Sequence, residues 1–487
     1  MSDQLVLHLA VAVPLLGALL IVLTGRSSRL RDAVTLVTSV SLFLLVASLA
    51  PAVAGGARPA VTWLELVPGL ALGLQVEPLG LMFGAIASGL WIANSLYSIG
   101  YMRANGERHQ TRFYAAFALA IGSAVGLAFS ANLVTLLIFY ELLTFSTYPL
   151  VTHRGGTEDR RAGRLYLGML FGTSVSFLML AILWTWVATG TTDFRDGGIL
   201  GGAVEGPLVA VLLALYVYGS GKAALMPLHR WLPAAMVAPT PVSALLHAVA
   251  VVKAGVFTVV KVITYTFGLD LLASVPATEW LMYVSGATVV LASVVALQQD
   301  DLKRRLAYST ISQLAYVIMA ASIFTPAAIV GAALHIASHA FGKVTLFFAA
   351  GSIYTASHKT KVSQLNGIGP RMPWTMAAFA LGSLSMIGLP PTGGFVSKWL
   401  IMSAAAEAGR WPILGVVVVS TLLTAGYFVP ILHRAYLRPL PGGDAGRAHG
   451  EAPRPMVAAL TASAALAVLM FLAADLPLSI AQLVASR

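Results

Sequence analysis

The sequence contains no cysteine and little charge: only 10% of its 487 residues are Asp, Glu, Lys or Arg. The absence of thiols excludes disulfides, iron–sulfur clusters and thiolate metal sites. So small a charged fraction cannot cover the surface of a soluble protein of this size. Hydrophobic residues make up 58% of the chain, in long apolar runs that recur from one end to the other. We therefore predict an all-α, polytopic membrane protein.

The polar breaks between these runs divide the chain into about fourteen transmembrane helices. The first run, residues 5–23, has no basic segment before it and no small-residue cleavage site after it. A secretory signal peptide carries both features. We therefore expect this run to be a retained helix.

Basic residues alternate between the loops. Twenty of the 30 Lys and Arg residues fall in every second loop, whereas the intervening loops hold four of them together with many acids. In bacterial inner-membrane proteins the positive loops face the cytoplasm. The sequence therefore predicts a multi-pass inner-membrane protein with both termini on the periplasmic side. The net charge of +11 follows from this topology, and we expect no nucleic-acid partner.

Seven charged residues fall inside the predicted spans. Inserting a charged side chain at the bilayer centre costs about 2.5 to 3.5 kcal/mol of free energy, so the presence of each of these residues needs an explanation. Lys261 lies near the outer end of its span, and we expect it to extend to the interface. For Arg230 that explanation and a functional role stay open. We expect a function from the other five: Glu141, Lys222, Lys253, Lys343 and Lys398.

Two apolar segments cannot be continuous helices. Residues 372–407 would form a helix about 54 Å long, against a membrane core of about 30 Å. Pro390 and Pro391 stand in its middle, shortly before Lys398. Prolines also interrupt residues 207–236. We therefore predict that both helices break at these prolines.

The second predicted break lies at Pro227, shortly after Lys222. Unpaired backbone groups at membrane depth are tolerated only where they line a polar cavity. Two breaks, each beside a buried lysine and in separate halves of the chain, favour an inverted repeat of the transporter type. Two unrelated proline kinks are the alternative.

Histidines and lysines form a second pattern. His335, His339 and Lys343 are spaced i, i+4 and i+8, on one face of a helix. Histidine titrates near neutral pH, so this stripe suits a proton relay. An alternative is that the two histidines are buried core residues with ordinary hydrogen-bond partners. A zinc site is a weaker alternative, because no carboxylate lies nearby in the sequence. His247 and Lys253 project about 120° apart and could flank the same pathway. We predict no metal, no cofactor and no catalytic site.

Several motifs occur in one order between about residues 131 and 400. They are KAALMPLHRWLP from Lys222, APTPVSALLH from Ala238, DLKRRLAYST from Asp301, the His335–Lys343 stripe, and GLPP from Gly388. Together they closely resemble the signature of the proton-translocating, antiporter-like subunits shared by Mrp cation/proton antiporters and respiratory NADH dehydrogenase.

This resemblance implies fourteen core helices with two inverted five-helix repeats, helices 4–8 and 9–13, in which helices 7 and 12 are broken. The corresponding domains are residues 1–110, 111–268, 277–436, and 437–487 for a cytoplasmic loop and helix 14. In the family, a glutamate on helix 5 pairs with a lysine on helix 7, and a path runs to a charged residue on helix 12. With our own candidates included, the proton-transfer residues are Glu141, Lys222, His247, Lys253, His335, His339, Lys343 and Lys398.

The resemblance also implies a function. We expect a proton-conducting subunit of a multi-subunit, Mrp-type monovalent cation/proton antiporter, similar in size to the D-type subunits of that group. The alternatives are a pumping subunit of NADH dehydrogenase or membrane-bound hydrogenase, and an energising subunit of an inorganic-carbon uptake complex. Expected partners are other membrane subunits, the lipid bilayer, protons, and Na⁺ or K⁺.

Overall fold

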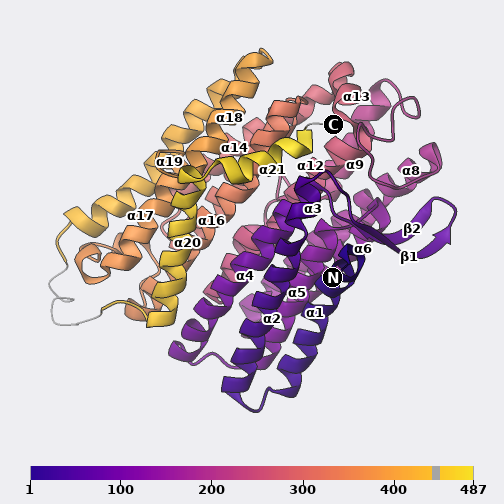
Figure 1. The fold of residues 1–487 in the computed structure, drawn as a ribbon. Helices are drawn as coiled ribbons and strands as arrows, with labels where there is room; N and C mark the ends of the chain where they lie inside the picture. The colour runs from indigo at the N-terminus through magenta and orange to yellow at the C-terminus, as the bar shows by residue number, and fades with distance from the viewer. Residues whose placement is uncertain (1, 441–449, 486–487) are drawn as a thin grey trace.

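The computed structural model describes residues 2–440 and 450–485, without the side chains of residues 246, 247 and 485. The chain forms a bundle of helices whose axes run roughly side by side (Figure 1). Among the described residues, ten helical segments are long and apolar enough to cross a membrane. They comprise α1 (Asp3–Leu23), α2 with α3 (Ser28–Ser48, Ala50–Ala54), α4 (Pro78–Ala104), α5 (Gln110–Ala128), α6 (Leu133–Val151), α7 with η1 and α8 (Thr157–Thr173, Ser174–Leu178, Met179–Thr189), α14 (Trp280–Gln298), α16 (Pro326–Ser357), α19 (Trp411–Leu437) and α20 (Arg454–Leu472).

The other predicted crossings correspond to helices that are broken, irregular or more polar. Their elements are α9 (Pro207–Gly219), η2 (Gly221–Ala223), α10 (Trp231–Ala234), η3 (Ala235–Val237), α11 (Thr240–Ala244), η4 (Leu245–Val249), α12 (Val251–Val262), η5 (Ile263–Phe267), α15 (Leu302–Ala321), α17 (Pro373–Ile387) and α18 (Gly393–Glu407). Both breaks lie where the prolines predict them. The total of about fourteen crossings, the inverted repeats and the domain boundaries stay predictions, and residues 441–449 of the predicted cytoplasmic loop lie outside the described part.

Some elements were not expected from the sequence. Strands β1 (Ala60–Val67) and β2 (Leu70–Gln75) form an antiparallel hairpin, which adds a small sheet to the predicted all-α fold. Helix α21 (Asp475–Ala485) follows α20, lies across the end of the bundle and packs on α4 and α16 (Figure 1). The short helices α13 (Leu269–Ser274), η6 (Pro276–Glu279), η7 (Val362–Gln364) and η8 (Gly369–Arg371) complete the chain.

Polar residues set where several helices begin. The side chain of Asn132 accepts a hydrogen bond of 2.9 Å from the Thr135 amide at the start of α6. Asp301 does the same for the Arg304 amide of α15, at 2.8 Å. Such caps satisfy amides that have no partner within the helix itself. They place the starts of α6 and α15, two helices that hold site residues.

Contacts among the loops gather the basic segments at one end of the bundle, here called the basic end. Arg154, after α6, pairs with Glu107, after α4. Lys303, at the start of α15, donates hydrogen bonds to the carbonyls of Met236 and Ala238. Further basic residues of this end include Arg26, Arg29, Arg103, Arg108, Lys359, Lys361 and Arg434.

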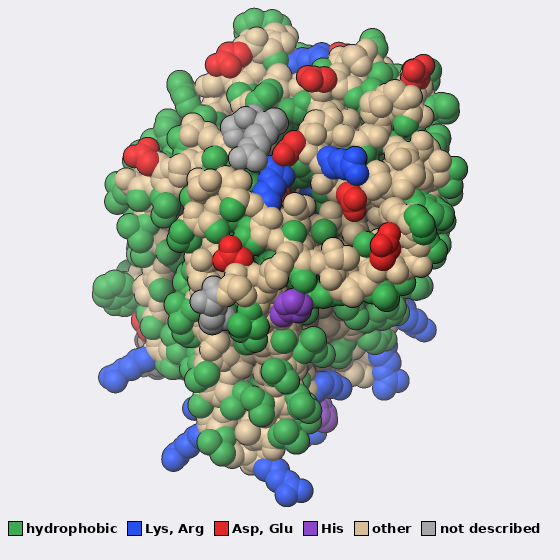
Figure 2. Space-filling model, turned by 45° about the vertical axis from the view of Figure 1, so that its right-hand side comes forward, with side chains coloured by type: hydrophobic (Ala, Val, Ile, Leu, Met, Phe, Trp, Pro, Cys, Tyr) green, Lys and Arg blue, Asp and Glu red, His purple; other side chains and the backbone are tan. Residues whose placement is uncertain are grey.

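The opposite end, here called the acidic end, holds Asp193, Asp196, Glu205, Asp270 and Glu279. Figure 2 shows Asp and Glu side chains, with some Lys and Arg among them, on the upper part of the molecule, whereas Lys and Arg side chains project from the lower end. This separation of charge follows the alternation of the loops in the sequence. Which end faces the cytoplasm stays a prediction.

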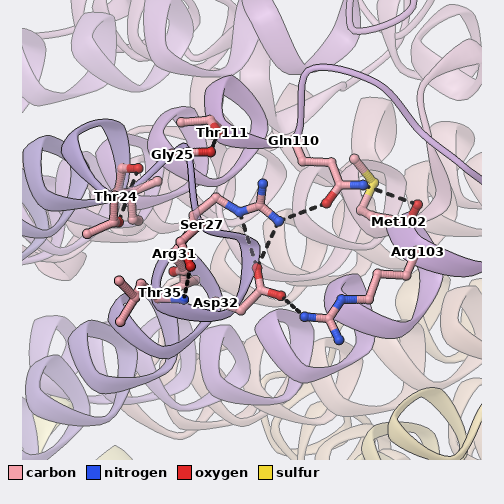
Figure 3. Close-up of polar contacts among 12 residues, drawn as sticks. Thr24, Gly25, Ser27, Arg31, Asp32, Thr35, Met102, Arg103, Gln110 and Thr111 are labelled. Carbon is pink, nitrogen blue, oxygen red and sulfur yellow. Dashed lines mark hydrogen bonds and ion pairs between the residues drawn. The ribbon is translucent and has the colours of Figure 1, made fainter.

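A buried charge cluster joins α2, α4 and α5 near the basic end. Asp32 pairs with Arg31 at 3.0 Å and also with Arg103, while Arg31 donates a hydrogen bond of 2.8 Å to Gln110 (Figure 3). Arg31 also lies 5.0 Å from the centre of the Tyr114 ring. The Asp32 side chain is only 7% exposed, so these arginines provide its charge compensation. The cluster fixes the N-terminal helices against the rest of the bundle.

Candidate functional site

Lys222 lies in the break after α9, within η2, and is fully buried. Its ammonium group donates hydrogen bonds to the Tyr140 carbonyl at 2.8 Å and to the Thr144 hydroxyl at 2.6 Å. The same nitrogen lies 3.1 Å from the centre of the Tyr140 ring, a cation–π contact. The broken helix thereby presents Lys222 to helix α6.

Glu141 follows Tyr140 on α6, between the two residues that Lys222 contacts. Both of its carboxylate oxygens are buried, and no hydrogen-bond donor reaches either one among the described residues. No ion pair within 4.0 Å joins it to Lys222 in this part of the chain. The predicted pairing at about 4 to 6 Å therefore stays a prediction. The polar groups that act on Glu141 are the Lys222 ammonium group and the hydroxyl groups of Ser174 and Thr144.

An apolar groove of about 370 Å³ opens beside Glu141 on the outside of the bundle. Side chains of α6, η1 and α8 line it, among them Leu137, Phe145, Val175 and Met179. Glu141 is one of the residues that line this groove, but its two carboxylate oxygens are turned away from the surface and buried.

Lys253 connects helix α12 to helix α16. It is fully buried in α12, and its side-chain nitrogen lies 2.5 Å from Nδ1 of His339 on α16. His247 belongs to the π-helical segment η4 that precedes α12, but its side chain lies outside the described ones. Irregular π-helical turns are frequent at functional sites, because they change which side chains face the interior.

His335 lies one turn before His339 on α16, and the centres of the two rings are 6.4 Å apart. Its Nε2 lies 3.1 Å from the Gln313 amide oxygen of α15, and its Nδ1 lies 3.0 Å from the Ser397 hydroxyl of α18. Ser397 in turn lies 3.0 Å from the Ser338 hydroxyl. This polar network connects the histidine stripe to the helix that carries Lys398.

Lys343 completes the stripe and is fully buried. It donates hydrogen bonds to the Ser309 hydroxyl at 2.6 Å and to the Leu306 carbonyl at 3.3 Å, both on α15. The Ser309 hydroxyl is also 2.9 Å from the hydroxyl of Tyr427 on α19. The predicted face of α16 therefore consists of buried side chains with polar neighbours on three other helices.

Lys398 lies on α18, just after the second break. Its ammonium group donates hydrogen bonds to the carbonyls of Met386 and Ile387, at 3.1 and 2.9 Å. These carbonyls end α17, where the helix dipole is negative, so they compensate the charge of Lys398 without a carboxylate. A second apolar groove, of about 250 Å³, opens beside Lys398 on the bundle surface.

The expectation for Lys261 was wrong. Its side chain does not extend to the interface: it is 1% exposed and forms an ion pair of 2.8 Å with Glu77, which precedes α4. The pair lies between segments far apart in the sequence, so the spacing of charges along the chain gave no sign of it. The one available signal was Glu77 itself, an acid placed directly before an apolar helix. Arg230, by contrast, is exposed.

Within the part of the chain that the structure describes, no group of three or more His, Asp or Glu side chains could hold a metal ion. The arrangement instead consists of single proton-binding groups that follow one another through the interior. Lysine and histidine side chains can each take up and release a proton, and their serine, glutamine and tyrosine neighbours can orient them.

Residues 130–424 match the family described as NADH:quinone oxidoreductase/Mrp antiporter, TM. Subunit N of the NADH-quinone oxidoreductase of Desulforudis audaxviator is 34% identical, and the match covers 83% of each chain. The A/B subunit of a probable K⁺/H⁺ antiporter of Rhizobium meliloti is 31% identical over 93% of this chain. NAD(P)H-quinone oxidoreductase chain 5 of Synechocystis is 34% identical over 77% of this chain. This chain spans about half the length of these last two relatives, 46% and 56%.

Solved structures share the fold. A chain of the Mrp complex of Dietzia superposes with a TM-score of 0.88 at 21% identity, and a chain of an archaeal membrane-bound sulfane sulfur reductase superposes with 0.86 at 24%. Each superposition covers 100% of this chain and 97% of the other.

Proposed function

The chain belongs to the NADH:quinone oxidoreductase/Mrp antiporter transmembrane family, and we propose that it conducts protons as one subunit of a multi-subunit cation/proton antiporter. The observation that carries this proposal is the contact of 2.5 Å between Lys253 and His339, which joins the buried lysine of α12 to the buried histidines of α16. Charged groups at this depth are expensive, and a proton path is the usual reason for them in membrane proteins.

The path in this proposal uses the residues in their order through the interior. Lys222 and Glu141 form its first part, at the first break. Lys253, followed by the stripe of His339, His335 and Lys343, forms its centre. Lys398, at the second break, forms its far end.

The two grooves support the proposal that other membrane subunits are partners. Glu141 and Lys398, at the two extremes of the path, each line an apolar groove on the bundle surface. A neighbouring transmembrane helix that covers such a groove would remove the charged group from lipid. We infer that the chain sits in a hetero-oligomeric complex, in a bacterial inner membrane with its basic end toward the cytoplasm.

A second candidate is a proton-pumping subunit of a redox complex. It is favoured by the subunit N relative, since that match covers 83% of both chains.

The two candidate functions are distinguished in membrane vesicles that contain the whole complex, purified by an affinity tag on this chain. For an antiporter we expect added Na⁺ or K⁺ to release protons from acidified vesicles. For a redox pump, proton movement requires an electron donor and a quinone, and cations have no effect. No proton movement under either condition would contradict both candidates.

A further inference from the structure

The Lys261–Glu77 pair lies outside the path described above. Both side chains are almost fully buried, at 1% and 6% exposure. The Lys261 ammonium group also donates a hydrogen bond of 2.9 Å to the Ser130 carbonyl. The ring centre of Phe194 lies 4.5 Å from the same nitrogen. A buried ion pair is weak evidence for stability alone, so another role for it is worth testing.

The pair lies between the centre of the path and the acidic end. Lys261 follows Lys253 by eight residues, about 12 Å along α12 at 1.5 Å per residue. The segment after α12 reaches the acidic end, where the Tyr265 carbonyl accepts a hydrogen bond of 3.1 Å from the Arg195 amide. Glu77 is held at this depth because it lies two residues after Gln75, the last residue of β2, whose amide donates to the Phe129 carbonyl. Lys261 thus holds Glu77 beside α12 between Lys253 and the acidic end.

Hydroxyl groups continue the route toward the surface. The side-chain oxygens of Thr192, Thr264, Tyr265 and Thr266 are buried, and none has a hydrogen-bond partner among the described residues. Buried hydroxyls are normally satisfied by protein atoms or by bound water, so water is expected beside these residues, and in the proposed exit such water continues the route. Beyond them, Arg58 lies 5.8 Å from the centre of the Tyr265 ring and pairs at 2.8 Å with Asp196. The Asp196 side chain is 34% exposed, which brings the route to the surface.

We propose that Glu77 and Lys261 form a proton exit that leads from Lys253 to the acidic end; this inference rests on the proposed function. A proton leaves the ammonium group of Lys253, which becomes a neutral amine, and reaches a carboxylate oxygen of Glu77, which becomes a neutral carboxyl group. Glu77 then releases the proton to water near Asp196 and re-forms its pair with Lys261, which stays charged throughout.

Two phenyl rings separate the exit from the centre of the path. Phe257 lies midway between Lys253 and Lys261 on α12, and its ring centre is 4.9 Å from that of Phe83 on α4. In the proposed exit, this aromatic contact is the barrier between Lys253 and Lys261 that a proton has to pass.

The first test removes both charges together. Replacing one partner alone leaves an unpaired buried charge, which destabilises the protein whatever the role of the pair. The double variant Glu77→Gln/Lys261→Met avoids this and keeps the shapes similar. We expect it to reach wild-type amounts in the membrane and to move protons roughly a hundredfold more slowly. Wild-type transport by the folded double variant would overturn the exit. If the wild-type protein itself moves no protons, the proposed function fails instead.

The second test does not depend on transport or on the stability of the double variant. The chain has no cysteine, so single cysteines can be introduced directly. Thr266→Cys lies on the proposed route, and Ile263→Cys is a matched control one turn earlier; both native side chains are 0% exposed. A membrane-impermeant maleimide, added from the side of the acidic end, is expected to label Thr266→Cys at least about tenfold faster, because the thiolate reacts only where water reaches it. Equal labelling of the two positions would overturn the hydrated route.

Discussion

The side-chain nitrogen of Lys253 on α12 lies 2.5 Å from Nδ1 of His339 on α16. A proton between an amine and an imidazole can reside on either nitrogen, so a charged Lys253 donates to a neutral ring and a charged ring donates to a neutral amine. The contact joins a helix of the predicted first repeat to a helix of the predicted second one. Proton exchange between the halves therefore requires no movement of either helix.

Removing this amine is expected to stop transport. Lys253→Met keeps the length of the side chain but not its proton, and we expect proton movement in vesicles to fall by roughly a hundredfold. Protein amounts in the membrane are measured alongside, and Arg29→Gln, at an exposed position in the first turn of α2, is the control. Transport at the wild-type rate in Lys253→Met would exclude this residue from the path.

Variants of Glu141 and Lys222 that keep or remove the side-chain charge test whether transport depends on that charge. Lys222→Met is expected to stop proton translocation, because Lys222 is the buried cation at the first break. Glu141→Asp keeps the carboxylate, whereas Glu141→Gln removes it, so we expect Glu141→Gln to be slower by about tenfold than Glu141→Asp. Transport is measured at matched amounts of protein. If Glu141→Gln were as fast as the wild type, the carboxylate would have no part in the path.

Gln313 positions His335 and was not among the predicted site residues. Its amide oxygen only accepts, so it orients the Nε2–H of His335 and leaves Nδ1 toward Ser397. Gln313→Leu is expected to slow transport by about tenfold while the protein stays folded. Gln298→Leu, at an exposed position of α14, is the control. The ring signals of His335 in nitrogen NMR would report the loss of a fixed tautomer; unchanged signals would contradict this role.

Local chemistry made the breaks and the buried charges predictable. Pro227 and Pro390 remove backbone donors within apolar segments, so the sequence alone indicates where the helices end. The partner of Lys261 could not be found in this way, because Glu77 reaches it only through the packing of α4 against α12. The hairpin was missed for a similar reason: its apolar residues resemble a short span, and its hydrogen bonds to the α5–α6 corner are tertiary.

The cluster around Asp32 is expected to act on stability and not on transport. Asp32→Asn leaves Arg31 almost buried without its carboxylate, and removing one partner of a buried pair costs about 3 kcal/mol. We expect a lower midpoint of thermal unfolding in detergent and a normal transport rate for each folded molecule. Asp3→Asn, in the exposed first turn of α1, is the control. A normal midpoint in Asp32→Asn would show that the cluster is dispensable.

Alanine variants of Gly388 and Gly409 together separate the effect of backbone strain from the effect of displacing the Lys398 side chain. It ends α17 with φ of +88°, and a Cβ added there would lie 2.6 Å from Cδ of Lys398. Gly409 has a similar φ of +68°, but a Cβ there would meet nothing within 4 Å. Gly388→Ala and Gly409→Ala should each cost about 1 to 2 kcal/mol, because L-residues resist this conformation.

Only Gly388→Ala also displaces the Lys398 side chain from the carbonyls of Met386 and Ile387. We therefore expect both variants to lower the midpoint of thermal unfolding, and Gly388→Ala alone to slow proton transport, by about tenfold. Because the strain is matched, a difference in transport isolates the position of the Lys398 ammonium group. Equal rates of proton transport in the two variants would show that the hydrogen bonds between Lys398 and the end of α17 do not limit that rate.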